Sequence, residues 1–134
     1  MTGSIAHTPP SYEPSLGLGE WMDTLIAYVR SGDPDLTNRQ MAIIFVAYTE
    51  RGPHTVRGLA SRLSVSKPVI TRALNKLGEL GYLRRQRDET DGRNIFVVTT
   101  DKGAQFLERF EHFLEHADAP VREHRSVEQR ALVG

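Results

Sequence analysis

Apolar residues recur every three or four positions between residues 66 and 81, which predicts an amphipathic helix. Ser66 can cap the amino end, Pro68 fits the first turn, and Gly81 suits a left-handed position just past the carboxyl end. The apolar stripe of this helix consists of Ile70, Ala73, Leu74, Leu77 and Leu80. The pattern therefore predicts one helix whose two ends are both encoded locally.

The opposite face of the same helix is basic and rich in hydrogen-bonding groups. It carries Lys67, Pro68, Thr71, Arg72, Asn75 and Lys76, with Val69 at its edge. Arg and Lys can bond guanine O6 and N7, Asn can bond adenine N6 and N7, and an aliphatic group can contact a thymine methyl. Such a face suits the major groove of DNA, although a basic helix face is more often ordinary solvated surface.

The elements that precede this helix favour the DNA interpretation. Thr37 and Gln40 have the spacing of a capping box, ahead of an almost wholly apolar run at residues 41–48 that predicts a buried central helix. A short strand is expected near residues 54–56 and a short helix at 57–63. Two short helices joined by a tight turn, the second with a polar face, are typical of a helix-turn-helix.

A β-hairpin is predicted directly after the helix-turn-helix. Residues 82–87 and 95–99 are two extended runs that flank a polar turn containing Gly92. Arg87 and Arg93 lie close to this turn. A hairpin in this position is a wing, and we expect these two arginines to contact DNA together with the helix residues and Ser66.

Two further helices are expected at the ends of the folded region, at residues 20–31 and 100–117, the second capped by Thr100. Their apolar stripes are wider than a small lobe needs, which predicts a homodimer, although for the first helix packing into its own core is an equally good interpretation. The expected interface residues are Trp21, Leu25, Val29, Phe106, Phe110, Phe113 and Leu114. We expect a tail at residues 1–17 and a single domain at 18–134, with its DNA-binding lobe at about 36–99. Beyond Pro120 the pattern indicates a weak helix or a tail.

Composition narrows the possible classes of protein. The chain has 134 residues, which suits one domain, and it has no cysteine, which excludes disulfides and thiolate chemistry. No apolar run approaches the roughly 20 residues that span a bilayer, and the amino terminus lacks the pattern of a signal peptide. We therefore expect a cytoplasmic protein with no membrane partner.

Charge is distributed unevenly although the formal net charge is zero. Residues 51–94 hold ten Lys and Arg against four Asp and Glu, a net charge of +6, so the remainder of the chain carries −6. The predicted helix-turn-helix and wing thus lie in the basic region, as binding to nucleic acid requires.

The pattern offers little support for an enzyme. No set of nucleophile, base and orienting group stands out, and Leu16-Gly17-Leu18-Gly19 lacks the preceding strand and third glycine of a phosphate loop. His112 and His116 have the spacing of a metal pair, but a solvated helix face is favoured because no further ligands accompany them. We expect no catalytic residues, no metal and no cofactor.

Taken in order, these motifs resemble the MarR-type winged helix-turn-helix transcriptional regulators. The resemblance rests on Leu36-Thr37-x-x-Gln40, Thr55-Val56-x-x-Leu59-Ala60, Val65-Ser66-x-Pro68-x-Ile70-Thr71-Arg72, Leu77-x-x-x-Gly81-Tyr82-Leu83-x-Arg85, Asp88-x-x-Asp91-x-Arg93 and Thr100-x-x-Gly103. Gly92 stands where the family often has arginine, and Thr99 where it usually has leucine. The segments before Glu20 and after His116 are short for the family's usual ligand pocket, so no particular small-molecule effector is predicted.

The sequence thus predicts a mainly α fold with a small β-hairpin wing and terminal dimerisation helices. Its expected function is sequence-specific binding of double-stranded DNA by a homodimer that regulates transcription, with the recognition helix in the major groove and the wing at the minor groove. The alternative is a winged-helix module for protein-protein interaction, whose basic face would dock on an acidic partner.

Overall fold

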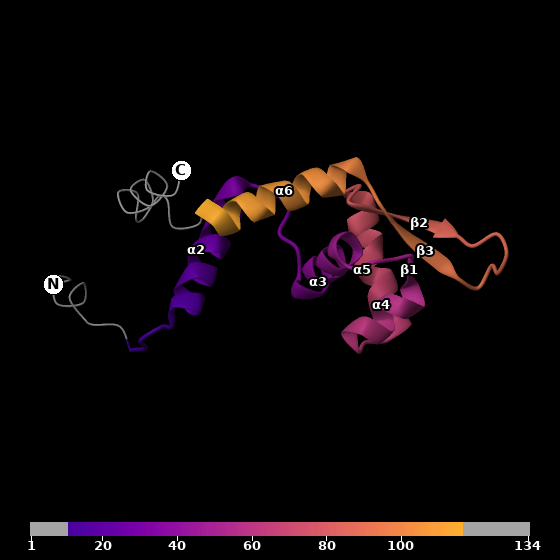
Figure 1. The fold of residues 1–134 in the computed structure, drawn as a ribbon, viewed down its shortest axis with the longest axis horizontal. Coiled ribbons are helices and arrows are strands. Elements are labelled where there is room, and N and C mark those ends of the chain that lie inside the picture. The colour runs from indigo at the N-terminus through magenta and orange to yellow at the C-terminus, as the bar shows by residue number, and fades with distance from the viewer. Residues whose placement is uncertain (1–10, 117–134) are drawn as a thin grey trace. The chain divides into compact units, whose positions relative to one another are not determined.

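The structure is a computed structural model that describes residues 11–116. In chain order its elements are α2 (Leu16–Ser31), α3 (Asn38–Thr49), β1 (His54–Thr55), α4 (Val56–Leu63), α5 (Lys67–Glu79), β2 (Leu83–Arg87), β3 (Ile95–Thr99) and α6 (Asp101–His116) (Figure 1). The winged-helix fold predicted from the sequence is confirmed. The expectations for residues 1–10 of the tail and for the segment after Pro120 lie outside the described residues.

The chain divides into two compact units, where the sequence predicted a single domain. Residues 33–111 form one unit, which contains α3, α4, α5, the sheet and most of α6. The other contains α2 and the end of α6 from His112 onward. The division passes through α6, a continuous helix whose sequence pattern shows no break at this point.

The core of the 33–111 unit is formed where α3, α4, α5 and α6 bury their apolar stripes. The most deeply buried side chains are Ile43, Ile44, Leu59, Ile70, Leu74, Leu77, Phe106 and Phe110. The small antiparallel sheet has the strand order β1-β3-β2, so β3 is central. Val97 of β3 is buried and packs the sheet onto the helical core.

Local signals in the sequence define the ends of several helices. In α3 the Thr37 backbone N–H donates to Gln40 Oε1 at 2.8 Å, and the Gln40 N–H donates to Thr37 Oγ1 at 3.1 Å, which confirms the capping box. After α5, Gly81 has a φ of +77°, and the Tyr82 N–H donates to the Leu77 carbonyl at 2.9 Å. This is the predicted stop with a left-handed glycine.

Two expectations about helix ends need correction. Helix α2 begins at Leu16, so residues 16 and 17 belong to the helix and not to the tail; Ser15 Oγ caps it by accepting from the Leu18 N–H at 3.1 Å. Ser66 does occupy the N-cap position of α5, but its side chain makes no capping hydrogen bond.

The expected dimer interface also needs correction at Phe106 and Phe110, which are only 0% and 1% exposed. Phe106 stacks on Tyr82 with ring centroids 4.7 Å apart, and Phe110 meets Phe45 edge to face at 5.5 Å. Both rings fill the core of this chain. Because every one of their faces is already covered, they are not available to a partner subunit.

Candidate nucleic-acid interface

The buried stripe of α5 sets which of its side chains face outward. Ile70, Ala73, Leu74 and Leu77 are buried, and α5 packs against α3, α4 and β2. The opposite face carries Lys67, Pro68, Arg72, Asn75 and Lys76, all exposed, with Val69 and Thr71 half-buried at its edges. The residues predicted to read DNA therefore share one accessible surface.

A tight turn fixes the start of this helix. Ser64 ends α4 in the left-handed region with φ +57°, and the Val65 N–H donates to the Ala60 carbonyl at 3.0 Å. The chain then enters α5 through Ser66, which is itself exposed. The connection between α4 and α5 thus leaves the amino-terminal end of α5 at the surface. This is the part of a helix-turn-helix that enters the groove of DNA.

The wing is a regular hairpin with an ordered tip, which projects from the helices of its unit in Figure 1. Strands β2 and β3 pair from Leu83 opposite Thr99 to Arg87 opposite Ile95. At the tip Asp88 Oδ1 accepts the Thr90 N–H at 2.9 Å. Donation by the Thr90 and Asp91 N–H groups lowers the pKa of the Asp88 carboxyl.

The two wing arginines have different surroundings. Arg87 Nη1 donates to the Gly92 carbonyl at 3.3 Å, which ties it to the turn. The Arg93 side chain is 86% exposed, and its Nε donates to Asp91 Oδ1 at 3.2 Å. Since guanidinium has five N–H donors, this contact orients Arg93 and leaves other donors for a ligand.

A third wing arginine, Arg85, contacts α5 and was not among the residues predicted from the sequence to contact DNA. Arg85 Nη2 donates to Asn75 Oδ1 at 2.8 Å. Side chains two apart on a strand share a face, and Leu83, two residues before Arg85, is buried in the core. The alternation from Leu83 was therefore the signal that Arg85 faces α5.

Arg39 was likewise not among the residues predicted from the sequence to contact DNA, and it lies close to Arg72. It lines a shallow depression of about 160 Å³ together with Arg72 of α5. The other lining residues are Thr37, Gln40, Val69 and Ala73. The depression thus places a second guanidinium beside the exposed face of α5, next to the amino end of α3.

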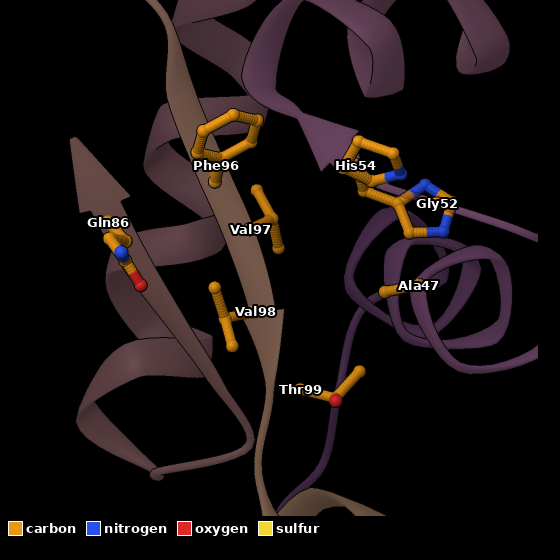
Figure 2. Close-up of a pocket in the computed structure, with 9 residues that line it drawn as sticks. Ala47, Gly52, His54, Gln86, Phe96, Val97, Val98 and Thr99 are labelled. Atoms are coloured by element: carbon orange, nitrogen blue, oxygen red, sulfur yellow. The ribbon is translucent and has the colours of Figure 1, made fainter. Parts of the chain in front are cut away.

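A larger hollow of about 400 Å³ lies beside β3, in the same unit (Figure 2). It is lined by Ala47, Gly52, Pro53, His54, Gln86, Phe96, Val97, Val98 and Thr99. The lining contains no Asp, Glu, Lys or Arg, and His54 Nε2 is already 2.9 Å from the Glu50 carbonyl oxygen. Its lining suits apolar contact and carries no Lys or Arg to attract a phosphate.

The other unit exposes an apolar surface on α2. Trp21 is 42% exposed and Val29 is 76% exposed, and Leu25 is also exposed. Phe113, at the end of α6, is half-buried and stacks on Tyr28 with ring centroids 6.1 Å apart, whereas Leu114 is exposed. Five of the seven predicted interface residues thus keep accessible surface.

Residues 11–116 lack both a cluster of metal ligands and a membrane-spanning helix. No group of three His, Asp or Glu residues in this range could hold a metal ion. No helix within it has the length and hydropathy needed to cross a bilayer.

Comparison with known proteins identifies relatives of this chain. Residues 35–94 match the model of the MarR family. An uncharacterized HTH-type transcriptional regulator of Bacillus subtilis, YkoM, is 33% identical over 70 residues, which are 52% of this chain and 45% of YkoM. The transcriptional regulator AdcR of Streptococcus pneumoniae is 36% identical over 81 residues, 60% of this chain and 54% of AdcR. The chain thus spans about half the length of these relatives.

Solved structures extend the similarity beyond the matched segment. The transcriptional regulator Tm0710 of Thermotoga maritima superposes with a TM-score of 0.58 and 26% identity, covering 88% of this chain and 83% of that one. The fold is also shared with overoxidized AbfR bound to DNA, with a TM-score of 0.59 and 21% identity over 84% of this chain and 79% of AbfR.

Proposed function

We propose that this chain, whose residues 35–94 match the model of the MarR family, binds specific duplex DNA as a homodimer that regulates transcription. The observation that carries the proposal is the shared exposure of Arg72, Asn75 and Lys76 on α5, beside a wing that carries Arg93. A surface that only attracted acidic partners would need positive charge. It would not need the amide of Asn75 and the hydroxyl of Thr71 beside that charge.

Each group has a role that follows from its chemistry. Arg72 and Asn75, at the middle of the exposed face, bond base edges in the major groove, with Thr71 and Val69 in apolar or hydroxyl contact. Lys67 and Lys76, as flexible point charges, neutralise phosphates. Arg39 joins them on the phosphate backbone because it borders the same depression as Arg72.

The wing takes the neighbouring minor groove. The Arg93 side chain is largely exposed near the tip of the wing, and an arginine there responds to the enhanced negative potential of narrow A·T-rich grooves. Asp91 holds its Nε, which reduces the side-chain freedom that would be lost on binding. Arg87 supports the turn through its hydrogen bond to the Gly92 carbonyl.

Dimerisation uses the apolar surface of the α2 unit. Monomeric proteins rarely expose large contiguous apolar surfaces, and such a surface usually marks an interaction site. A two-fold axis there would present two copies of α5 to successive major grooves about 34 Å apart, so the operator is an inverted repeat with half-sites roughly 10 base pairs apart. Because a DNA-binding regulator must reach the chromosome, the proposal includes a cytoplasmic location.

The test is selection of bound fragments from random duplex DNA, followed by titration of the selected duplex at increasing salt. We expect an inverted-repeat consensus and a loss of affinity on the order of a thousandfold or more between about 50 and 200 mM salt if roughly 6 to 10 phosphates are neutralised. The matched control is the double variant Arg72→Ala with Asn75→Ala, which should keep weak nonspecific binding and lose the consensus. No consensus and a flat salt response would instead favour the protein-interaction module.

A further inference from the structure

The amide of Asn75 has a defined orientation in the DNA-free protein. Arg85 Nη2 donates to its Oδ1 at 2.8 Å. Guanidinium has five N–H donors and no acceptor, so only the oxygen of the amide can face Arg85. The bond therefore directs the Asn75 oxygen toward the wing strand and the Nδ2 amino group away from it.

The fold, and not chance proximity of two surface side chains, brings these groups together. Asn75 follows the buried Leu74 and comes one turn after Thr71, so it lies on the exposed face of α5. Arg85 stands opposite the buried Val97 in the sheet register, on the sheet face that α5 packs against. Both backbones are thus anchored by core residues.

We propose that Arg85 determines base specificity by occupying Asn75 Oδ1, so that Asn75 reads guanine in preference to adenine. The inference rests on the proposed binding of DNA. A free asparagine is suited to adenine, because it can accept from N6 and donate to N7 at once. Because Arg85 draws the Asn75 oxygen toward the wing strand, the Nδ2 amino group is the part of the amide left to face the groove. The guanine edge, with N7 and O6, presents acceptors only and suits these donors.

The hydrogen bond between Arg85 and Asn75 becomes stronger when DNA binds. In the free protein both side chains are exposed, and water competes for each of them. In a groove contact that water is largely displaced, and a charge-assisted hydrogen bond is stronger in the lower local dielectric. Breaking it to accept from adenine N6 would then leave a guanidinium donor without a partner, which adds a penalty against adenine. Arg85 is in this sense a positioning residue for Asn75.

The experiment is parallel selection from random duplex DNA with the wild-type protein, Asn75→Ala and Arg85→Ala. The position whose preference disappears in Asn75→Ala is the one that Asn75 reads. We expect guanine there in the wild type, and in Arg85→Ala a shift toward adenine of roughly fivefold or more relative to guanine. Arg85→Lys, which keeps a donor for Oδ1, should retain guanine.

The matched control is Arg84→Ala. Arg84 is the neighbouring exposed arginine of the same strand and pairs with Val98, so its side chain lies on the other sheet face. It removes the same charge but should leave the base preference intact. The inference is overturned if the wild type selects adenine at that position, or if Arg85→Ala selects the same base there as Arg84→Ala. Either result still shows sequence-specific binding and leaves the proposed function standing. If the wild type selects no sequence at all, the proposed function fails, and the inference with it.

Discussion

The hydroxyl group of Tyr48 donates a hydrogen bond to the backbone carbonyl oxygen of Tyr82 over 2.7 Å. The hydroxyl oxygen of Tyr48 in turn accepts the backbone N–H of Thr100 at 3.0 Å. A side chain at Gly103 would overlap both the Tyr48 hydroxyl and the Tyr82 carbonyl, so only glycine allows α6 to approach this closely. One tyrosine of α3 thus joins the segment after the recognition helix to the start of α6.

Removing this hydroxyl should destabilise the protein without changing its fold. Tyr48→Phe leaves the Thr100 N–H and the Tyr82 carbonyl without their partner, and we expect a loss of about 1 to 3 kcal/mol in the free energy of unfolding. Urea denaturation followed by circular dichroism measures it. Tyr12→Phe is the control, because Tyr12 is 71% exposed. Equal stability of the two variants would contradict this role for Tyr48.

Tyr82 should make stability sensitive to alkaline pH. Burial raises the pKa of its phenol above the ordinary value of 10.0, with a smaller opposing effect from the positive charge of Arg109. Because the folded pKa is raised, the stabilisation is complete below the unfolded pKa, near pH 10, and is lost as pH rises through the folded value. The Tyr82→Phe variant should lack this alkaline loss, measured by urea denaturation across that range. An unchanged alkaline profile would contradict the prediction.

Arg72 and Lys76 should differ in kind when each is replaced by alanine. We expect Arg72→Ala to cost about 1 to 3 kcal/mol per half-site and to relax the preference at one base position. Lys76→Ala should weaken all sequences alike and reduce the salt slope by about 1. Titration of specific and random duplexes separates the two effects. If Arg72→Ala loses equal affinity for both duplexes, Arg72 contacts the backbone and not a base.

Arg93 should govern the preference for sequence that flanks each half-site. In Arg93→Ala we expect any A·T preference in the flanks to disappear while the central consensus persists, because minor-groove potential depends on groove width. Selected-fragment sequencing gives the comparison. Should the flank preference survive, Arg84, Arg85 and Arg87 become the candidates for its origin.

Charges placed on α2 should separate the subunits. The interface test avoids Phe110, which is buried in its own protomer, and uses Leu25→Glu with Val29→Glu on the exposed apolar surface. Burying unpaired carboxylates is costly, so we expect a folded monomer in sedimentation that has lost specific binding. Ala104→Glu with Gln105→Glu, at exposed positions of α6, is the control and should stay dimeric. A dimeric α2 variant with full affinity would place the interface elsewhere.

The features that the sequence determined are those set by neighbours within a few residues. The capping box of Thr37 and Gln40 and the left-handed stop at Gly81 each depend on one turn of backbone, so pattern alone located them. The exposed face of α5 followed in the same way, because its buried stripe leaves only one orientation for Arg72 and Asn75. The similarity to known regulators extends over these same local patterns.

The tertiary structure decided which groups each side chain contacts. Helical period placed Phe106, Phe110 and Leu114 on α6 without showing that the first two would be buried against Tyr82 and Phe45 while Leu114 stays exposed. Likewise, Arg85 and Asn75 are ten residues apart, and their bond exists only because β2 folds back onto α5. The physical reason is the same in both cases. Periodicity specifies the direction in which a side chain points from its own element, whereas the group that it meets depends on how elements distant in the chain pack together.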